Sequence, residues 1–234
     1  MHNVFVKTKN VMRSVEMIDN LKERGNGVPG FGLIYSDPGL GKTETCTWFV
    51  GRKGSNAVYV RARAAISHRW FFEMIVNALG AEPYYRFSSL FGQAVELLTG
   101  SNVMLIIDEA DFCCHDSRVL ESLRDLHDEC GTPILLIGMG SVDKKLMRHP
   151  HFFSRISQIN KFQPLDSEDI IKAAKELCEV NLTDEASDAM AKASSGCFRS
   201  LKIIINHLEV LAKRNNLKQI DASHIKDLDW RAKK

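Results

Sequence analysis

An eight-residue segment at positions 36–43 constrains the fold of this chain more than any other feature. A short apolar run precedes the segment and a helical pattern follows it, which predicts a loop between a strand and a helix. Its two glycines allow the backbone to curl, so that successive N–H groups can point at phosphate oxygens. The start of the following helix adds partial positive charge at the same place. The residues predicted to bind phosphate are Ser36, Asp37, Pro38, Gly39, Leu40, Gly41, Lys42 and Thr43.

The end of this loop carries the chemistry of a nucleotide site. Lys42 supplies a point charge for the β- and γ-phosphates, and Thr43 supplies a hydroxyl ligand for Mg²⁺. Ser36 stands where loops of this pattern usually have their first glycine, which is one departure from the pattern. Since a strand is expected before the loop and a helix after it, the sequence predicts a P-loop that binds ATP with Mg²⁺.

Short apolar runs alternate with longer amphipathic segments as far as Gln163. The middle runs are continuously apolar, which is typical of strands buried on both faces of a parallel sheet. Alternating strands and helices predict a three-layer α/β domain. The expected strands lie at about 31–35, 57–61, 103–107, 133–137 and 157–162, and the expected helices at about 11–24, 42–52, 68–79, 87–98, 116–129 and 142–148.

The strand signals stop after Pro164. Ser167 and Asp184 are plausible amino-terminal caps for helices in the segment that follows. The predicted organisation is therefore a P-loop ATPase core at residues 1–163 and a small helical lid domain at residues 164–234. The expected lid helices lie at about 167–179, 184–193, 199–214 and 222–228.

Two acidic residues directly follow the apolar run at 103–107. Asp108 is expected to hold the Mg²⁺ shell at the carboxyl edge of the sheet, where ligands bind in such folds. Glu109 is expected to orient and deprotonate the attacking water. An apolar strand that ends in acid is weak evidence alone, but ATP hydrolysis needs both this pair and the P-loop. The two features together predict an ATPase.

Charge and composition narrow the class of partner. Lys and Arg total 31 against 29 Asp and Glu, so a basic surface for nucleic acid has to be local. The candidate contacts with DNA phosphates, after the second expected strand, are Arg61, Arg63 and Arg69. The sequence shows no apolar stretch of membrane-spanning length and no export signal, and its six cysteines lack zinc spacing. A cytoplasmic location, in a bacterial or phage-infected cell, is therefore expected.

The P-loop and the acidic pair make the chain resemble an AAA+ ATPase over most of its length. The resemblance implies two arginines that act on the γ-phosphate. Arg199 stands at the start of a lid helix, like the family's sensor-2 arginine. Arg155 precedes the fifth strand, like the arginine finger that acts on the nucleotide of a neighbouring subunit. The sensor-1 position matches Met139, with Ser141 as a polar substitute nearby, which implies hydrolysis that is slow or stimulated by a partner.

A narrower resemblance is to the target-selection ATPases of transposition, the phage Mu B family. It rests on Lys9-Asn10-Val11, on the spacing between Tyr35 and Thr43, and on the segments 136–140 and 149–156. This resemblance implies an ATP-dependent helical oligomer around double-stranded DNA, bound without sequence specificity. It also implies that the oligomer delivers or activates target DNA for a transposase.

Two rival functions share the same ATPase core. One is a helicase loader or replication initiator, which would recruit a helicase in place of a transposase. The other is a secretion-associated remodelling ATPase that needs no DNA. ATP-dependent binding of random-sequence duplex DNA separates the transposition and replication functions from the secretion-associated function.

Overall fold

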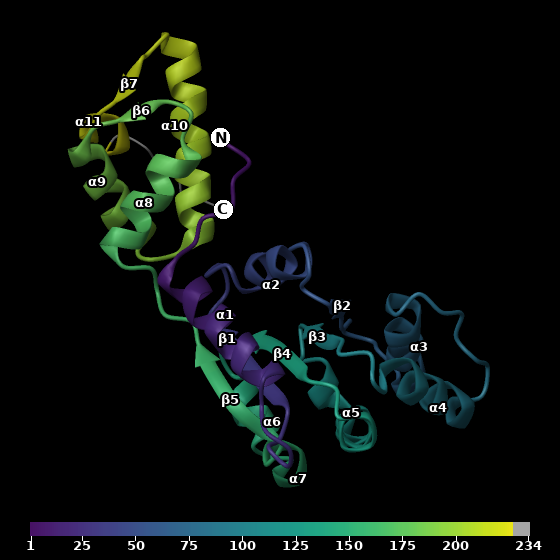
Figure 1. Cartoon of the computed structure of the whole chain (residues 1–234). Coiled ribbons are helices and arrows are strands. Elements are labelled where there is room, and N and C mark those ends of the chain that lie inside the picture. Colours follow the sequence, from purple (N-terminus) through teal and green to yellow (C-terminus); the bar gives the residue numbers. More distant parts are fainter. Residues whose placement is uncertain (227–234) are drawn as a thin grey trace. The chain divides into compact units, whose positions relative to one another are not determined.

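The structure is a computed structural model that describes residues 1–226. Its larger unit is built on a five-stranded sheet with the order β2-β3-β4-β1-β5, in which all neighbouring strands are parallel (Figure 1). The α/β parallel architecture predicted from the sequence is confirmed, and the five predicted strands lie close to their expected positions. The strands are β1 (Phe31–Ser36), β2 (Ala57–Arg61), β3 (Met104–Asp108), β4 (Ile134–Met139) and β5 (Ile156–Lys161).

Helices cover both faces of this sheet. Alternate residues of a strand point to opposite faces. Leu105 and Leu136 join one buried cluster with residues of α3, α4 and α5. Gly32 faces the other way, since a side chain there would meet Leu21 and Met17 of α1. The buried strands therefore form the middle of three layers, which explains why their sequences are continuously apolar.

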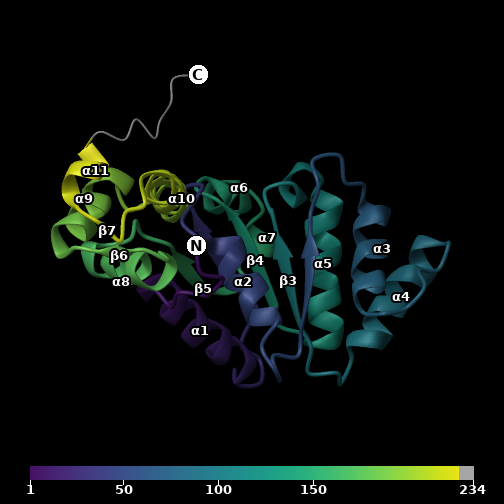
Figure 2. The same ribbon diagram turned by 90° about the horizontal axis from the view of Figure 1, so that it is seen from above.

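The helices of the larger unit begin and end at recognisable signals. Ser67 caps α3 by accepting a hydrogen bond from the Trp70 N–H, and Gly131 ends α5 with a left-handed φ of 68°. Figure 2 shows α3 and α4 packed side by side. The helix predicted at 142–148 ends at Leu146, and a short helix that was not predicted starts at Pro150. The helices are α1 (Lys9–Lys22), α2 (Lys42–Val50), α3 (His68–Ala78), α4 (Phe87–Leu98), α5 (Ser117–Cys130), α6 (Val142–Leu146) and α7 (Pro150–Phe153), with a short 3₁₀ turn η1 (Cys113–His115).

The chain divides into two compact units. The sheet unit contains Arg13–Pro38 and Lys42–Phe162, and the smaller unit contains Met1–Met12, Gly39–Gly41 and the residues from Gln163 onward. This grouping differs from the predicted division at residues 163/164, because the first twelve residues, Gly39–Gly41 and Gln163 belong with the smaller unit. Val6 explains the place of the first twelve residues, since its side chain is buried in the apolar cluster of the carboxy-terminal helices.

The smaller unit is a helical bundle with one small sheet. Its helices are α8 (Ser167–Leu177), α9 (Asp184–Ser194), α10 (Phe198–Asn215) and α11 (Ala222–Lys226). Residues 227–228 of the last predicted helix lie outside the described residues. The structure adds a parallel pair of strands, β6 (Asn181–Leu182) and β7 (Gln219–Ile220), that the sequence did not predict. Two-residue strands are too short to show the alternation by which strands are recognised.

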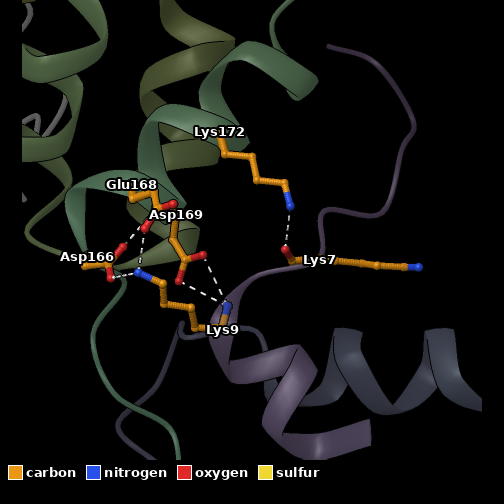
Figure 3. A network of polar contacts seen from close by, with 6 residues as sticks. All are labelled: Lys7, Lys9, Asp166, Glu168, Asp169 and Lys172. Atoms are coloured by element: carbon orange, nitrogen blue, oxygen red, sulfur yellow. Dashed lines mark hydrogen bonds and ion pairs between the residues drawn. The ribbon is translucent and has the colours of Figure 1, made fainter.

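Polar contacts also fasten the amino-terminal segment to α8 (Figure 3). The Lys9 backbone N–H donates to both carboxylate oxygens of the buried Asp169, at 3.1 and 3.2 Å. The Lys9 ammonium pairs with Asp166 at 2.6 Å and with Glu168 at 2.7 Å. Because these carboxylates lie in the first turn of α8 or at its cap, the segment and the helix stabilise each other.

Candidate nucleotide site and its basic edge

The predicted P-loop lies at the carboxyl edge of the sheet, between the end of β1 and the start of α2. Gly39 and Gly41 have φ angles of 87° and 93°, in the left-handed region that glycine occupies without strain. Ser36, at the position of the missing glycine, is a buried strand residue outside that region. A serine is accommodated there because the backbone at this point is still that of a strand.

Lys42 is anchored inside the loop that it closes. Its ammonium donates to the carbonyl oxygens of Ser36 and Asp37, at 2.9 and 3.1 Å, and to the Ser36 hydroxyl at 3.0 Å. Burial lowers the pKa of Lys42, and the nearby carboxylates of Asp108 and Glu109 oppose that effect. The Lys42 ammonium is thus held as a positively charged hydrogen-bond donor at the place where the sequence predicts phosphate oxygens.

Asp108 ends β3 and is almost fully buried. Its Oδ2 accepts hydrogen bonds from the Thr43 hydroxyl at 2.8 Å and from the Tyr59 hydroxyl at 2.6 Å. Its Oδ1 accepts from the Glu109 N–H at 2.8 Å. A hydroxyl and a carboxylate that meet at one point are the hard oxygen ligands that Mg²⁺ prefers, so these residues fit the predicted metal.

Tyr59 is a site residue that the sequence analysis missed. It lies on β2 and pairs in register with Ile106 of β3, which places its hydroxyl beside Asp108. Burial, and then the hydrogen bond to Asp108, raise the pKa of Tyr59, so it stays a protonated donor. The sequence offered one signal for Tyr59, since it lies on the second expected strand two residues before Arg61 and therefore on the same face of that strand. Only the pairing of β2 with β3 reveals that its partner is Asp108.

Glu109 occupies an unusual backbone conformation. Its φ is 56°, which for a residue other than glycine costs on the order of 1–3 kcal/mol and recurs at functional sites. Its carboxylate forms an ion pair with the Arg61 guanidinium, with 3.2 Å between Oε1 and Nη2. The predicted catalytic base and a predicted DNA contact are therefore partners in the structure.

The end of β4 is held by a second acidic residue that the sequence analysis did not assign. The buried Asp111 accepts from the Met139 N–H at 2.6 Å and from the Lys145 ammonium at 2.9 Å. The Met139 side chain is exposed, and Ser141 starts α6 without a side-chain cap. Asp111 thus fixes the backbone where the resemblance places sensor 1.

Arg155 lies at the opposite, amino-terminal edge of the sheet. Its carbonyl oxygen accepts from the N–H of Phe31, the first residue of β1. Its guanidinium forms a two-pronged ion pair with Asp128 of α5, at 3.0 and 2.9 Å. Arg155 and Asp128 also line a pocket of about 570 Å³ beside the loop at 24–29. Within one chain, Arg155 and Glu109 are therefore at opposite ends of the strands.

Arg199 belongs to the smaller unit, in the first turn of α10. Its backbone N–H donates to the carbonyl oxygen of Gly39, which belongs to the same unit, at 3.0 Å. A side chain at Gly39 would come within 3.2 Å of the Arg199 Cβ. Glycine is therefore needed at position 39 for a second reason, the close approach of this helix start.

The other two predicted DNA contacts lie near aromatic rings. The Arg63 guanidinium lies 5.4 Å from the centre of the Trp70 ring. Arg69 lies 4.8 Å from the centre of the Tyr85 ring and forms an ion pair with Glu73 at 2.7 Å. Arg61 ends β2, Arg63 lies in the segment that follows, and Arg69 is in the first turn of α3.

Comparisons with known proteins identify the family of this chain. A family model described as AAA domain matches residues 26–146, just over half of the chain. A "Potential ATP-binding protein" of Staphylococcus aureus is 27% identical over 155 residues, which are 62% of this chain and 54% of that protein. The chain therefore spans about half the length of this curated relative.

Solved structures with the same fold have low sequence identity to this chain. The ORC2 protein of Aeropyrum pernix, in ADPNP and ADP complexes, aligns with a TM-score of 0.73 and 16% identity, over 96% of this chain and 69% of its own. The ORC1 protein of Aeropyrum pernix in complex with DNA aligns with a TM-score of 0.67 and 18% identity, over 99% and 66%. The RuvB Holliday junction branch migration motor of Thermotoga maritima aligns with a TM-score of 0.64 and 19% identity, over 94% and 68%.

None of the helices within residues 1–226 is long and apolar enough to span a membrane.

Proposed function

The chain belongs to the AAA domain family of ATPases, and from that premise we propose an ATPase that binds duplex DNA without sequence specificity and prepares it for a partner enzyme. The observation that carries the DNA-binding part of this proposal is the ion pair between Arg61 and Glu109. It joins a basic sheet edge, suited to phosphate, to the residue proposed to activate water.

The proposed nucleotide chemistry uses residues that are already held in place. Lys42 binds the β- and γ-phosphates, and Thr43 and Asp108 hold Mg²⁺, which would neutralise charge on the phosphate oxygens. Tyr59 orients Asp108 through its hydroxyl. Glu109 accepts the proton of the attacking water once its carboxylate is free to face that water.

DNA binding is proposed to control hydrolysis through Arg61. While Arg61 is paired with Glu109, the carboxylate is neutralised and turned toward β2. A DNA phosphate competes for the same guanidinium, because phosphate oxygens and carboxylates bind arginine in the same way. Binding of the duplex by Arg61, with Arg63 and Arg69, would therefore release the base and stimulate a slow ATPase.

The two arginines implied by the family resemblance are assigned to assembly and to nucleotide sensing. We assign Arg199 to the γ-phosphate because its backbone contacts Gly39 of the P-loop. We assign Arg155 to the nucleotide of a neighbouring copy in an ATP-dependent oligomer. Its position at the amino-terminal edge supports this role, since it cannot reach the Glu109 of its own chain without crossing the sheet.

The class of partner enzyme is proposed from the structural neighbours. The ORC1 neighbour was solved in complex with DNA, which favours a replication-initiator or helicase-loader role. A transposase is the second candidate, favoured by the resemblance in segments 9–11 and 136–140. Packing accounts for part of that resemblance, since Asn10 exchanges hydrogen bonds with Gln163 and a side chain at Gly138 would collide with Val142.

The decisive test compares hydrolysis and DNA binding in wild type and Arg61→Ala. In wild type, random-sequence duplex should bind only with ATP or a non-hydrolysable analogue, with strong salt dependence, and should raise the ATPase rate. In Arg61→Ala, the basal rate should rise toward the stimulated rate, while the salt slope of binding falls by about one. Arg13→Ala, an exposed arginine on α1, is the matched control and should behave as wild type.

If the protein binds no duplex DNA in the presence of ATP, its analogue or ADP, the DNA-binding function is wrong. The secretion-associated, DNA-independent role would then replace it. If duplex binds, a pull-down with a replicative helicase and with a transposase decides between the two partners.

A further inference from the structure

The loop at residues 80–86, between α3 and α4, presents two tyrosines to solvent. Tyr84 is 56% exposed, and Tyr85, at 86%, is the most exposed large apolar residue within residues 1–226. The other rings of α3 and α4 behave differently, since Phe71 and Phe72 are fully buried and Phe87 and Phe91 pack against that core. The two tyrosines are therefore not needed to build the helix pair that carries them.

The loop is fixed in shape although its tip is exposed. The Gln93 side chain of α4 accepts from the Tyr84 N–H at 3.1 Å and donates to the Glu82 carbonyl at 2.8 Å. Arg69 of α3 lies against the Tyr85 ring, at 4.8 Å from its centre. Both helices thus hold the loop, which reduces the entropy that an aromatic contact with a ligand would cost.

Basic residues lie beside the Tyr85 ring and next to it in the chain. Arg86 is exposed directly after Tyr85, and Arg69 lies over the ring itself. Arg63, over Trp70, continues the basic surface back toward the end of β2. The acidic residues of this surface are Glu73, which is paired with Arg69, and the exposed Glu82.

We infer that Tyr85, supported by Tyr84, is a stacking platform for an unpaired DNA base, with the surrounding arginines on the adjoining phosphates. This inference rests on the proposed DNA-binding function and goes beyond it. A paired duplex presents phosphates to arginines but hides the faces of its bases, so it gives an exposed ring nothing to stack on. Aromatic rings interleaved with arginine match a strand whose bases are unstacked, because every base has a face that can stack.

The platform adds a preference for opened DNA to a protein that holds any duplex. It is joined to the hydrolysis site through the basic surface, since Arg61 is two residues from Arg63 and pairs with Glu109. Capture of an unpaired nucleotide therefore brings DNA to the basic surface that includes Arg61. Through Arg61, this surface controls Glu109, the proposed catalytic base.

The experiment measures binding of a duplex and of the same duplex with a run of mismatched central nucleotides, in a non-hydrolysable ATP analogue. Wild type should prefer the mismatched DNA by roughly tenfold, the scale of one stacked base. Tyr85→Ala should lose that preference while keeping its affinity for the paired duplex. Tyr85→Phe should keep the preference, because the ring is retained. Val28→Ala, an exposed apolar residue just before β1, is the control and should retain it too.

A fluorescent 2-aminopurine in the mismatched run supplies a second readout. Stacking should quench it in wild type and Tyr85→Phe but not in Tyr85→Ala. Equal binding of the two DNAs by wild type, with no quenching, would overturn the platform while leaving the proposed duplex binding intact. Absence of binding to both DNAs would instead overturn the proposed function. A Tyr85→Ala protein that keeps the preference but no longer responds to a partner protein would show that the loop binds protein.

Discussion

The two edges of the sheet hold their charged residues in different ways. At the carboxyl edge, Asp108 is buried and engaged by Thr43, Tyr59 and the backbone of Glu109. At the amino-terminal edge, the side chains of Arg155 and Asp128 are 37% and 38% exposed and have each other as partners. Interlocked buried groups keep one geometry, whereas an exposed ion pair contributes little and is exchanged easily. The difference supports the proposal that Arg155 changes partners, whereas Asp108 is held in place within its own chain.

The largest effect is expected at the exposed edge. Arg155→Ala should bind ATP like wild type. Its rate of ATP hydrolysis on DNA should fall by about 10³-fold if the arginine acts in trans. ATP titration and steady-state turnover measure the two properties separately. Glu109→Gln should also bind ATP and lose turnover, because it cannot accept a proton.

Mixing these two variants tests whether the site is shared. Each lacks a different half of the composite site, so some mixed interfaces pair an intact Glu109 with an intact Arg155. Partial recovery of turnover is expected. Wild-type turnover by Arg155→Ala alone would place the arginine finger elsewhere.

At the interlocked edge, Lys42→Ala should weaken ATP binding by roughly tenfold to a hundredfold, since bonds to charged groups contribute about 1.5–3 kcal/mol. A fluorescent ATP analogue measures the affinity, and circular dichroism checks that the protein is folded. Unchanged affinity in a folded variant would contradict the assignment of the P-loop.

A smaller change is expected for Tyr59→Phe, which removes only the hydroxyl that orients Asp108. The Mg²⁺ concentration for half-maximal hydrolysis should rise by about fivefold, equivalent to about 1 kcal/mol for one hydrogen bond. Nucleotide binding in the absence of Mg²⁺ should not change, which separates a positioning role from a general loss of structure. Equal effects with and without Mg²⁺ would assign Tyr59 to the fold alone.

The smallest effect is expected for Asp128→Asn, which removes the carboxylate that holds Arg155. Arg155 holds the pKa of Asp128 below its usual value, so the pair stabilises the fold above that range and loses its effect as pH falls through the lowered pKa. Because both groups are over one third exposed, the loss at neutral pH should stay below about 1 kcal/mol. Denaturant unfolding of wild type and variant at neutral and acid pH measures it. A loss of several kcal/mol would show that the pair is structural and not exchangeable.

Much of the nucleotide site could be predicted because its parts are contiguous in the chain. The roles predicted for Gly39, Gly41 and Lys42 depend on local backbone geometry and the start of one helix, and Asp108 and Glu109 stand at the end of one apolar strand. The middle strands β3 and β4 were predicted because burial on both faces leaves continuous apolar runs. The strands β6 and β7 were missed because two residues are too few to show a strand pattern.

The sequence by itself determined the loop, the acidic pair and the alternation of strands and helices, since each depends on neighbours along the chain. Only the tertiary structure decided which distant residues meet. Tyr59 reaches Asp108, and Arg61 reaches Glu109, because β2 lies beside β3. The first twelve residues belong with the carboxy-terminal helices because Val6 is buried there and Lys9 binds the carboxylates of α8. Such pairings depend on the order of strands and the closing of long loops, which no local propensity specifies.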